Sequence, residues 1–117
     1  MKIVAILQAR CNSQRLPNKV LKEINGKPMI EHQINRIKKS RLIGELIVAT
    51  SNEETDLPLL DLCNKIKVKA FAGSLNNVLD RFYRTAITTN ADIIVRLTGD
   101  CPLTDPDIID NTIKLHI

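Results

Sequence analysis

Short apolar segments alternate along the chain with longer segments in which apolar residues recur every three or four positions. The first kind is typical of buried strands, and the second of helices that pack one face against a sheet. Their alternation is the pattern of β-α-β units and favours an α/β fold with a parallel sheet. We therefore predict four strands, at Lys2–Leu7, Glu45–Thr50, Lys69–Ala72 and Asp92–Leu97.

Four helices are expected to follow these strands. After a loop, Lys27-Pro28 should open the first, which runs to about Lys39, since proline is favoured at the first helical position. The second is placed near Asp56–Lys67, while an Asn76 cap and Asp105-Pro106 mark the starts of the other two. The side chains expected to face the core are Ile30, Ile34, Ile37, Leu59, Leu60, Cys63, Ile66, Val78, Leu79, Phe82, Ala86, Ile108, Ile109 and Ile113.

The composition is that of one globular domain. The chain has 117 residues, of which 44% are hydrophobic and 26% charged, and this excludes a disordered or fibrous chain. No apolar run approaches the roughly 20 residues that span a bilayer, so no membrane partner is expected. Three cysteines without a Cys-x-x-Cys pair argue against a disulfide framework or a zinc site. A reducing cytoplasm fits best.

The net charge of +4 favours an anionic partner but does not by itself choose between nucleic acid, membrane surface and nucleotide. Aromatic residues make up only 3% of the chain and tryptophan is absent, so a stacking platform for bases has little to be made from. We expect a small anion as partner and no nucleic acid.

Three cations lie in one connection after the first predicted strand. Arg10, Arg15 and Lys19 repel one another there, with Ser13 between them, and a polyphosphate would relieve that repulsion. In open parallel sheets, ligands bind beyond the carboxyl ends of the strands, where this loop is expected. Taken as charges alone, they could equally be solvated surface residues.

The order of residues in this loop resembles a family signature. Residues 8–21 read Gln-Ala-Arg-Cys-Asn-Ser-Gln-Arg-Leu-Pro-Asn-Lys-Val-Leu, similar to the A-R-x-x-S-x-R-L-P-x-K signature of the acylneuraminate and 3-deoxy-manno-octulosonate cytidylyltransferases. The resemblance is strongest to the spore coat polysaccharide branch of that family. Further matching stretches at 26–30, 49–51, 73–83 and 96–103 extend it over nearly the whole chain.

The resemblance implies a three-layer α/β/α sandwich with a mostly parallel sheet, the Rossmann-like nucleotide-diphospho-sugar transferase fold. Residues 1–117 would be the N-terminal, nucleotide-binding portion of a truncated nucleotidyltransferase domain. Asn12 and Asn18 stand where family members often have glycine. Asparagine tolerates positive φ better than most residues, so the loop shape can survive.

A second candidate lies in the loop after the fourth strand. Asp100 would sit at the carboxyl rim, and a carboxylate is a ligand that Mg²⁺ prefers, although aspartate after glycine is also a common turn residue. The resemblance implies that Asp100 is the metal ligand. Asp105, Asp107 and Asp110 are explained by helix capping and the helix dipole.

The resemblance implies an enzyme that transfers CMP from CTP to a sugar acid and releases pyrophosphate, in bacterial-type surface polysaccharide biosynthesis. Mg²⁺ would be the cofactor, held by Asp100. The implied catalytic residues are Arg10, Lys19 and Asp100. The implied substrate contacts are Gln8, Ala9, Ser13, Arg15, Ser74, Arg96 and Thr98.

The sequence also suggests positions for Arg96 and for four residues not yet discussed. Arg96, a charge in an apolar strand, either snorkels from a sheet edge or faces the ligand rim, and we favour the rim. The resemblance gives Arg81 a supporting position behind the site. His32 and His116 are interpreted as surface residues. Cys11 lies among cations that would lower the pKa of its thiol, but the chemistry requires no thiolate, so its presence is interpreted as incidental.

Alternative functions remain open at this point. The chain could be a non-catalytic nucleotide-binding or regulatory module, or a relative that uses another nucleoside triphosphate. A basic nucleic-acid-binding domain ranks lower, since aromatic residues and a basic helix are missing. Family members are roughly twice as long as these 117 residues, so the resemblance assigns another metal-binding acidic residue, most of the sugar pocket and much of a homodimer contact to a second half outside this chain.

Overall fold

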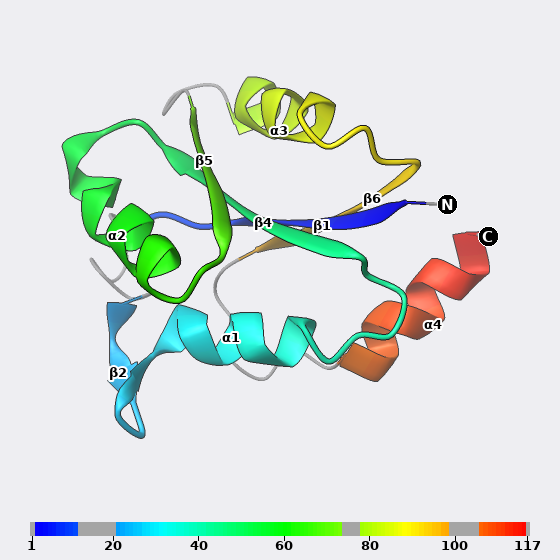
Figure 1. Ribbon diagram of the computed structural model, residues 1–117, viewed down its shortest axis with the longest axis horizontal. Helices are drawn as coiled ribbons and strands as arrows, with labels where there is room; N and C mark the ends of the chain where they lie inside the picture. The colour runs from blue at the N-terminus through cyan, green and yellow to red at the C-terminus, as the bar shows by residue number, and fades with distance from the viewer. Residues whose placement is uncertain (1, 12–20, 74–77, 99–105, 117) are drawn as a thin grey trace.

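The computed structural model describes residues 2–11, 21–73, 78–98 and 106–116. Within these ranges the chain forms a four-stranded parallel sheet in the order β5-β4-β1-β6, with helices on both faces (Figure 1). The predicted α/β sandwich with a mostly parallel sheet is thereby confirmed. The main elements are β1 (Ile3–Gln8), α1 (Met29–Ile37), β4 (Glu45–Ser51), α2 (Leu57–Lys65), β5 (Lys69–Gly73), α3 (Val78–Ile87), β6 (Ile93–Thr98) and α4 (Pro106–His116).

The central strand β1 is buried on both faces because helices cover the sheet from both sides. Its alternate residues divide between two apolar clusters, as the two-residue period of a strand requires. Ile3, Ala5 and Leu7 face α1, α2 and α4, whereas Val4 and Ile6 face α3. The core is thus two layers, one on each face of the inner strands β1 and β4.

Most of the predicted inward side chains are buried, but two predictions were wrong. Ile108 is 63% exposed, because the inner stripe of α4 runs through Ile109 and Ile113, four positions apart. Leu60 packs in neither apolar cluster, and Leu62 joins the inner stripe of α2 in its place. The side chains of Val78 and Leu79 lie outside the described part of the chain.

A short hairpin precedes α1, where a loop was predicted. Its strands are β2 (Glu23–Ile24) and β3 (Lys27–Pro28), and they pair antiparallel. The turn residues Asn25 and Gly26 have φ angles of 54° and 83°. Positive φ at both central positions is typical of a two-residue hairpin turn, for which Asn-Gly is the favoured sequence. The helix therefore begins at Met29 rather than at Lys27.

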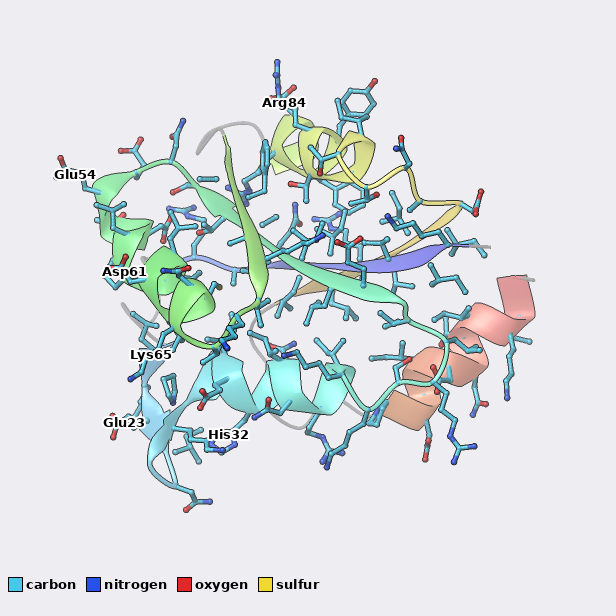
Figure 2. All side chains as sticks on the ribbon, viewed as in Figure 1. Glu23, His32, Glu54, Asp61, Lys65 and Arg84 are labelled. Carbon is cyan, nitrogen blue, oxygen red and sulfur yellow. The ribbon has the colours of Figure 1, made fainter. Side chains whose placement is uncertain are left out.

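The interpretation of Asp110 was wrong, and His32, a residue of the surface, has a partner that the sequence did not predict. The buried carboxylate of Asp110 does not serve the helix dipole; it accepts hydrogen bonds from the hydroxyl of Ser40 and from the N–H groups of Arg41 (2.9 Å) and Leu42 (3.3 Å). His32 is half-buried and donates a ring N–H to the carbonyl of Ile24, which joins α1 to the hairpin (Figure 2). Both side chains therefore hold connections in place.

Candidate functional site

The carboxyl ends of the four parallel strands meet at one rim, with β1 at its centre. Gln8, the last residue of β1, is paired with Ala49 of β4 and Thr98 of β6. The next residue continues along the sheet, since the N–H of Ala9 donates to the carbonyl of Ala49 at 3.0 Å. Arg10 follows directly, so the structure places the base of the predicted phosphate loop at this rim.

A buried carboxylate fixes the base of this loop. Asp56 ends a short 3₁₀ helix (Glu54–Asp56) and is fully buried. Its side chain makes no capping bond to α2, but accepts hydrogen bonds from the backbone N–H of Cys11, at 2.6 Å, and from the hydroxyl of Ser51. The Nε atom of Arg10 lies 4.0 Å from the same carboxylate, an ion-pair distance. Asp56 thus joins the loop after β1 to the end of β4.

The sequence analysis interpreted Asp56 only as the start of a helix. An aspartate just before a helix is most simply explained as an N-cap, and the residue lies 45 positions from its partner Cys11. No local pattern connects the two. Only the parallel pairing of β1 with β4 brings them together.

Arg81, from the first half of α3, adds a buried cation to this rim beside the partly exposed Arg10. Its side chain is 3% exposed and packs against Gly73 at the end of β5, where an added Cβ atom would lie 3.0 Å from the Cγ of Arg81. Burial and the neighbouring Arg10 guanidinium lower the pKa of Arg81, while Asp56 opposes the shift. We call Arg10, Arg81 and Asp56 the rim cluster. It brings together two guanidinium groups and one carboxylate.

Arg96 contacts both the rim and the α3 face. Its Nε–H donates to the Gln8 side-chain oxygen at 3.0 Å, and its guanidinium carbon lies 5.8 Å from the centroid of the Phe82 ring. That distance allows a cation–π contact. Arg96 is exposed and belongs to β6, the edge strand of the described sheet. Both interpretations of this residue are therefore partly correct: it lies on an edge, yet it binds the last residue of β1.

The structure brings four predicted site residues together: Gln8, Ala9, Arg10 and Arg96. The backbone of Thr98 joins them through its pairing with Gln8, although its side chain is not described. Five other predicted residues lie outside the described part of the chain: Ser13, Arg15, Lys19, Ser74 and Asp100.

The described part of the site favours an anionic ligand. The buried Nε atom of Arg10 has no hydrogen-bond partner among the described residues, since 4.0 Å to Asp56 is too long for a hydrogen bond. The hydroxyl of Thr50, at the end of β4, also has none within the same ranges. Buried polar groups normally have partners, so an unfilled donor beside a second guanidinium group is suited to an anion's oxygen atoms.

The described residues provide no metal centre. No three histidine, cysteine, aspartate or glutamate side chains in these ranges lie close enough to hold a metal ion, and both oxygens of Asp56 already accept hydrogen bonds. The Mg²⁺ prediction therefore rests on Asp100, outside the described residues. Burial, together with Asp56, raises the pKa of the Cys11 thiol, so the lowered value considered for it was wrong.

A parallel sheet covered by helices on both faces, with cations at its carboxyl rim, is the architecture of nucleotide-binding α/β proteins. The chain belongs to the cytidylyltransferase family, whose sequence model matches residues 4–116. The colinear resemblance in the sequence is thus confirmed at the level of the family. None of the described helices is long and apolar enough to cross a membrane.

Individual relatives cover the chain almost completely. An uncharacterized protein of Methanocaldococcus jannaschii is 43% identical over 114 residues, which are 97% of this chain and 47% of that protein. The spore coat polysaccharide biosynthesis protein SpsF of Bacillus subtilis is 37% identical over 118 residues, 97% of this chain and 49% of its own. A 3-deoxy-manno-octulosonate cytidylyltransferase of Geobacter metallireducens is 39% identical over 113 residues, 97% and 44% of the two chains. The chain spans about half the length of these relatives.

Two solved structures are similar in both sequence and fold. A cytidylyltransferase from Leptospira borgpetersenii is 37% identical with a TM-score of 0.92, covering 98% of this chain and 48% of its own. A CMP:2-keto-3-deoxy-manno-octonic acid synthetase complexed with CTP is 29% identical with a TM-score of 0.86, covering 97% and 46%. The structural similarity therefore covers nearly all of this chain and about half of each of the two relatives.

Proposed function

We propose that the protein transfers CMP from CTP to a sugar acid, with release of pyrophosphate, in the biosynthesis of a bacterial-type surface polysaccharide. CTP and the sugar acid come from the names of two relatives, and the polysaccharide role from a third. The observation that carries the proposal is the rim cluster, in which Asp56 binds the Cys11 N–H and faces Arg10 at the base of the signature loop. Residues 1–117 form the nucleotide-binding part in this proposal.

The rim cluster suits a nucleoside triphosphate for an electrostatic reason. Among the described residues, two guanidinium groups and one carboxylate meet there, and the proposal adds Arg15 and Lys19 to them. Bringing three or more cations together costs free energy unless an anion neutralises them. The β- and γ-phosphates of CTP carry that neutralising charge, and guanidinium groups match phosphate oxygens in geometry.

In the proposed reaction, Arg10, Arg15 and Lys19 bind the β- and γ-phosphates of CTP. A hydroxyl oxygen of the sugar acid attacks the α-phosphorus in line. One P–O bond forms as the bond to the β-phosphate oxygen breaks; pyrophosphate leaves with the electron pair, and the hydroxyl proton passes to solvent. Positioning and charge neutralisation supply most of the catalysis in such transfers.

The other predicted contacts keep their places in the proposal. Gln8 and Arg96, held together at 3.0 Å, line the rim beside the nucleotide. We propose Asp100 as the ligand of Mg²⁺, which when bound would neutralise phosphate charge. The remaining proposed nucleotide contacts are Ala9, Ser13, Ser74 and Thr98.

The cellular setting is also a proposal. Cys11 and Cys63 are buried free thiols, which are more common in reducing compartments, and this supports a cytoplasmic location. A homodimer, expected from the resemblance, stays a prediction that gel filtration with light scattering can test.

A thermal-shift panel with CTP, UTP, GTP and ATP, each with Mg²⁺, tests nucleotide binding. CTP is expected to raise Tm most, because a ligand that binds only the folded state stabilises it. Arg10→Ala and Lys19→Ala should each abolish the CTP-induced shift, whatever they do to the starting Tm. Arg41→Ala is the control. It removes an exposed cation from the connection between α1 and β4, away from the rim, and should leave the CTP-induced shift unchanged. Asp100→Ala should remove mainly the Mg²⁺ dependence.

A pyrophosphate-release assay with sugar acids as acceptors then tests turnover. No Tm shift with any nucleotide would contradict the proposal at its first step. A CTP shift without pyrophosphate would leave the chain a nucleotide-binding module. A larger shift with another nucleotide would instead identify the base that the site recognises.

A further inference from the structure

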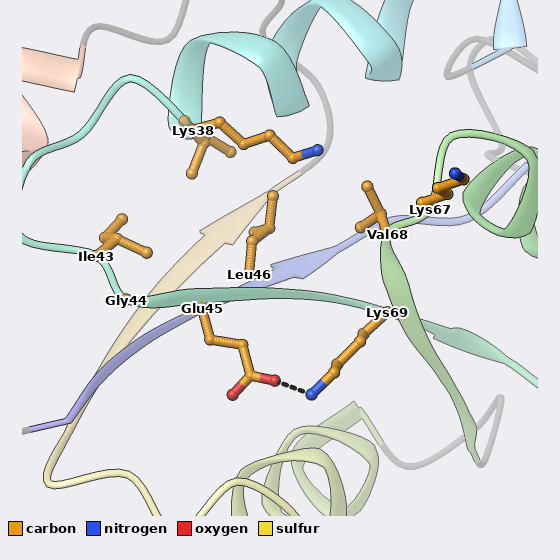
Figure 3. A pocket seen from close by; sticks show the side chains of 9 residues that line it. Lys38, Ile43, Gly44, Glu45, Leu46, Lys67, Val68 and Lys69 are labelled. Carbon is orange, nitrogen blue, oxygen red and sulfur yellow. Dashed lines mark hydrogen bonds and ion pairs between the residues drawn. The ribbon is translucent and has the colours of Figure 1, made fainter.

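A pocket lies on the opposite rim of the sheet from the rim cluster. It has a volume of about 310 Å³ and opens between the end of α1 and the amino ends of β4 and β5 (Figure 3). Four apolar side chains line it, Ile37, Ile43, Leu46 and Val68, together with Gly44 and four charged residues, Lys38, Glu45, Lys67 and Lys69. Its volume is at the lower end of the range for small-molecule sites.

Two lysines at this pocket are not neutralised. Lys38 follows α1 and Lys67 precedes β5, and neither side chain has an ion pair or hydrogen bond with another described residue. Glu45, the one acid in the lining, belongs to the other side of β4 (Figure 3). There it binds Lys69 and lies 3.3 Å from Lys2, so its charge is already matched. Neither lysine at the pocket therefore has a counter-charge among the described residues.

Lys67 occupies a backbone position that lysine does not favour. Its φ angle is 61°, in the left-handed region. The N–H of Val68 donates to the carbonyl of Cys63 at 2.8 Å and the N–H of Lys67 to that of Asn64 at 3.2 Å, the two bonds of a Schellman helix end. Glycine, and after it asparagine, is preferred at this position. The left-handed backbone does not favour a lysine here, whereas the dipole of α2 favours a cation after its last turn, as the dipole of α1 does at Lys38.

We propose that this pocket binds a small organic anion with an apolar body, either a carboxylate or a phosphate monoester. The ammonium groups of Lys38 and Lys67 bind the anionic head, and Leu46 and Val68 contact the body. Charge-assisted hydrogen bonds of this kind are among the stronger ones in proteins. The site is separate from the rim cluster and does not depend on the proposed function.

An NMR titration of the ¹⁵N-labelled protein with hexanoate and, separately, hexyl phosphate tests the proposal. Saturable shifts of the Lys38, Leu46, Lys67 and Val68 amides are expected with at least one of the two anions, and the tighter one identifies the head group. Hexanol and hexylammonium, at the same concentrations, should produce no saturable shift. Equal binding of hexanol would overturn the proposal, as would shifts confined to Arg10 and Cys11.

Lys67→Gly separates the charge from the fold. Glycine fits the left-handed position, so Tm should stay the same or rise, while the affinity for the anion should fall about tenfold or more. Lys38→Gln should weaken binding to a similar degree. Lys65→Gln, which removes an exposed cation from α2, is the matched control and should leave binding unchanged. Unchanged affinity in Lys67→Gly would exclude the proposed site.

Discussion

The carboxylate of Asp56 accepts a 2.6 Å hydrogen bond from the backbone N–H of Cys11, a residue 45 positions earlier in the chain. Both residues are fully buried, and the same carboxylate binds the hydroxyl of Ser51 and lies 4.0 Å from Arg10. One side chain therefore connects the loop after β1, the end of β4 and the start of α2. Its removal should affect all three connections.

We expect Asp56→Asn to reduce the free energy of unfolding by about 2–4 kcal/mol, because it removes a fully buried carboxylate that lies 4.0 Å from the Nε atom of Arg10 and also stabilises the charge of Arg81. Asp56→Ala should cost a further 1–3 kcal/mol or so, since it also leaves the Cys11 N–H unpaired. Urea denaturation followed by circular dichroism measures both values. Equal stability of the asparagine and alanine variants would show that the hydrogen bond to Cys11 contributes nothing.

Ser51→Ala is the matched control for this pair of variants. It removes one hydroxyl partner of Asp56 but no charge, and should cost only about 1 kcal/mol. A loss as large as that of Asp56→Asn would contradict the assignment of the effect to charge.

We predict that Gly73→Ala is destabilising by roughly 1–3 kcal/mol, as expected for overpacking a filled space. The added Cβ would lie 3.0 Å from the Cγ of Arg81 and 3.2 Å from a ring carbon of Phe71. Gly44→Ala is the control, because its Cβ would meet only the carbonyl oxygen of Ile3, at an ordinary 3.5 Å. Thermal unfolding of the two variants gives the comparison.

A double-mutant cycle tests the cause of the Gly73 effect. In an Arg81→Ala background the cost of Gly73→Ala should fall, since the crowded side chain is gone. If the two effects add instead, the contact with Arg81 is not the reason.

The strands could be predicted from the sequence to within a residue at each end, because buried parallel strands are nearly continuous apolar runs with a polar residue on either side. The hairpin at Asn25-Gly26 was missed, although that dipeptide is a strong turn signal. Its strands have only two residues each, too short for an alternating pattern to show. Ile108 was misplaced because it is adjacent to Ile109 near the start of α4, and two neighbouring apolar residues are compatible with more than one helical face.

The candidate site could be predicted only where its residues are close together in the sequence. Gln8, Ala9 and Arg10 lie in one signature loop, and the structure places them at the rim as expected. Asp56 could not be found, because its role depends on a partner across the sheet. Arg81 was expected only in a supporting position, yet its guanidinium is buried close to Arg10 and Asp56.

Acid should weaken the contact between α4 and the connection after α1. Burial alone would raise the pKa of Asp110, but hydrogen bonds from Ser40, Arg41 and Leu42 hold it below its usual range. An unfolded aspartate has a pKa of about 3.9. The folded state therefore binds fewer protons near that pH, so this stability is present above about pH 5 and is lost as pH falls through the lower, folded pKa.

Asp110→Asn should lower the free energy of unfolding by about 1–3 kcal/mol at pH 7, and the difference from the parent protein should shrink below about pH 4. Denaturant curves at several pH values give this difference. Asp61→Asn removes an exposed carboxylate and should stay within about 0.5 kcal/mol throughout. A difference for Asp110→Asn that does not change with pH would contradict the role of its ionisation.

The thiols of Cys11 and Cys63 should resist alkylation in the folded protein. Burial raises the pKa of Cys63 to about 11, with Cys11 adding to the shift, and burial with Asp56 raises that of Cys11. Alkylation requires an accessible thiolate, so at pH 8 both should react with iodoacetamide far more slowly than glutathione does. Peptide mass spectrometry reports each site, and in denaturing urea the protection should disappear. Native Cys11 reacting as fast as glutathione would contradict this prediction.

The close approach of Gly73 to Arg81 also limits how the sequence can change over evolution. A larger residue at position 73 should be accepted more readily if position 81 also becomes smaller, because an added Cβ would lie 3.0 Å from the Cγ of Arg81 and the arginine would have to shift. A change at position 81 in turn removes a cation from the rim cluster. Residues in contact tend to vary together among homologous sequences. These two positions should therefore be inherited as a pair, with glycine kept wherever the arginine is kept.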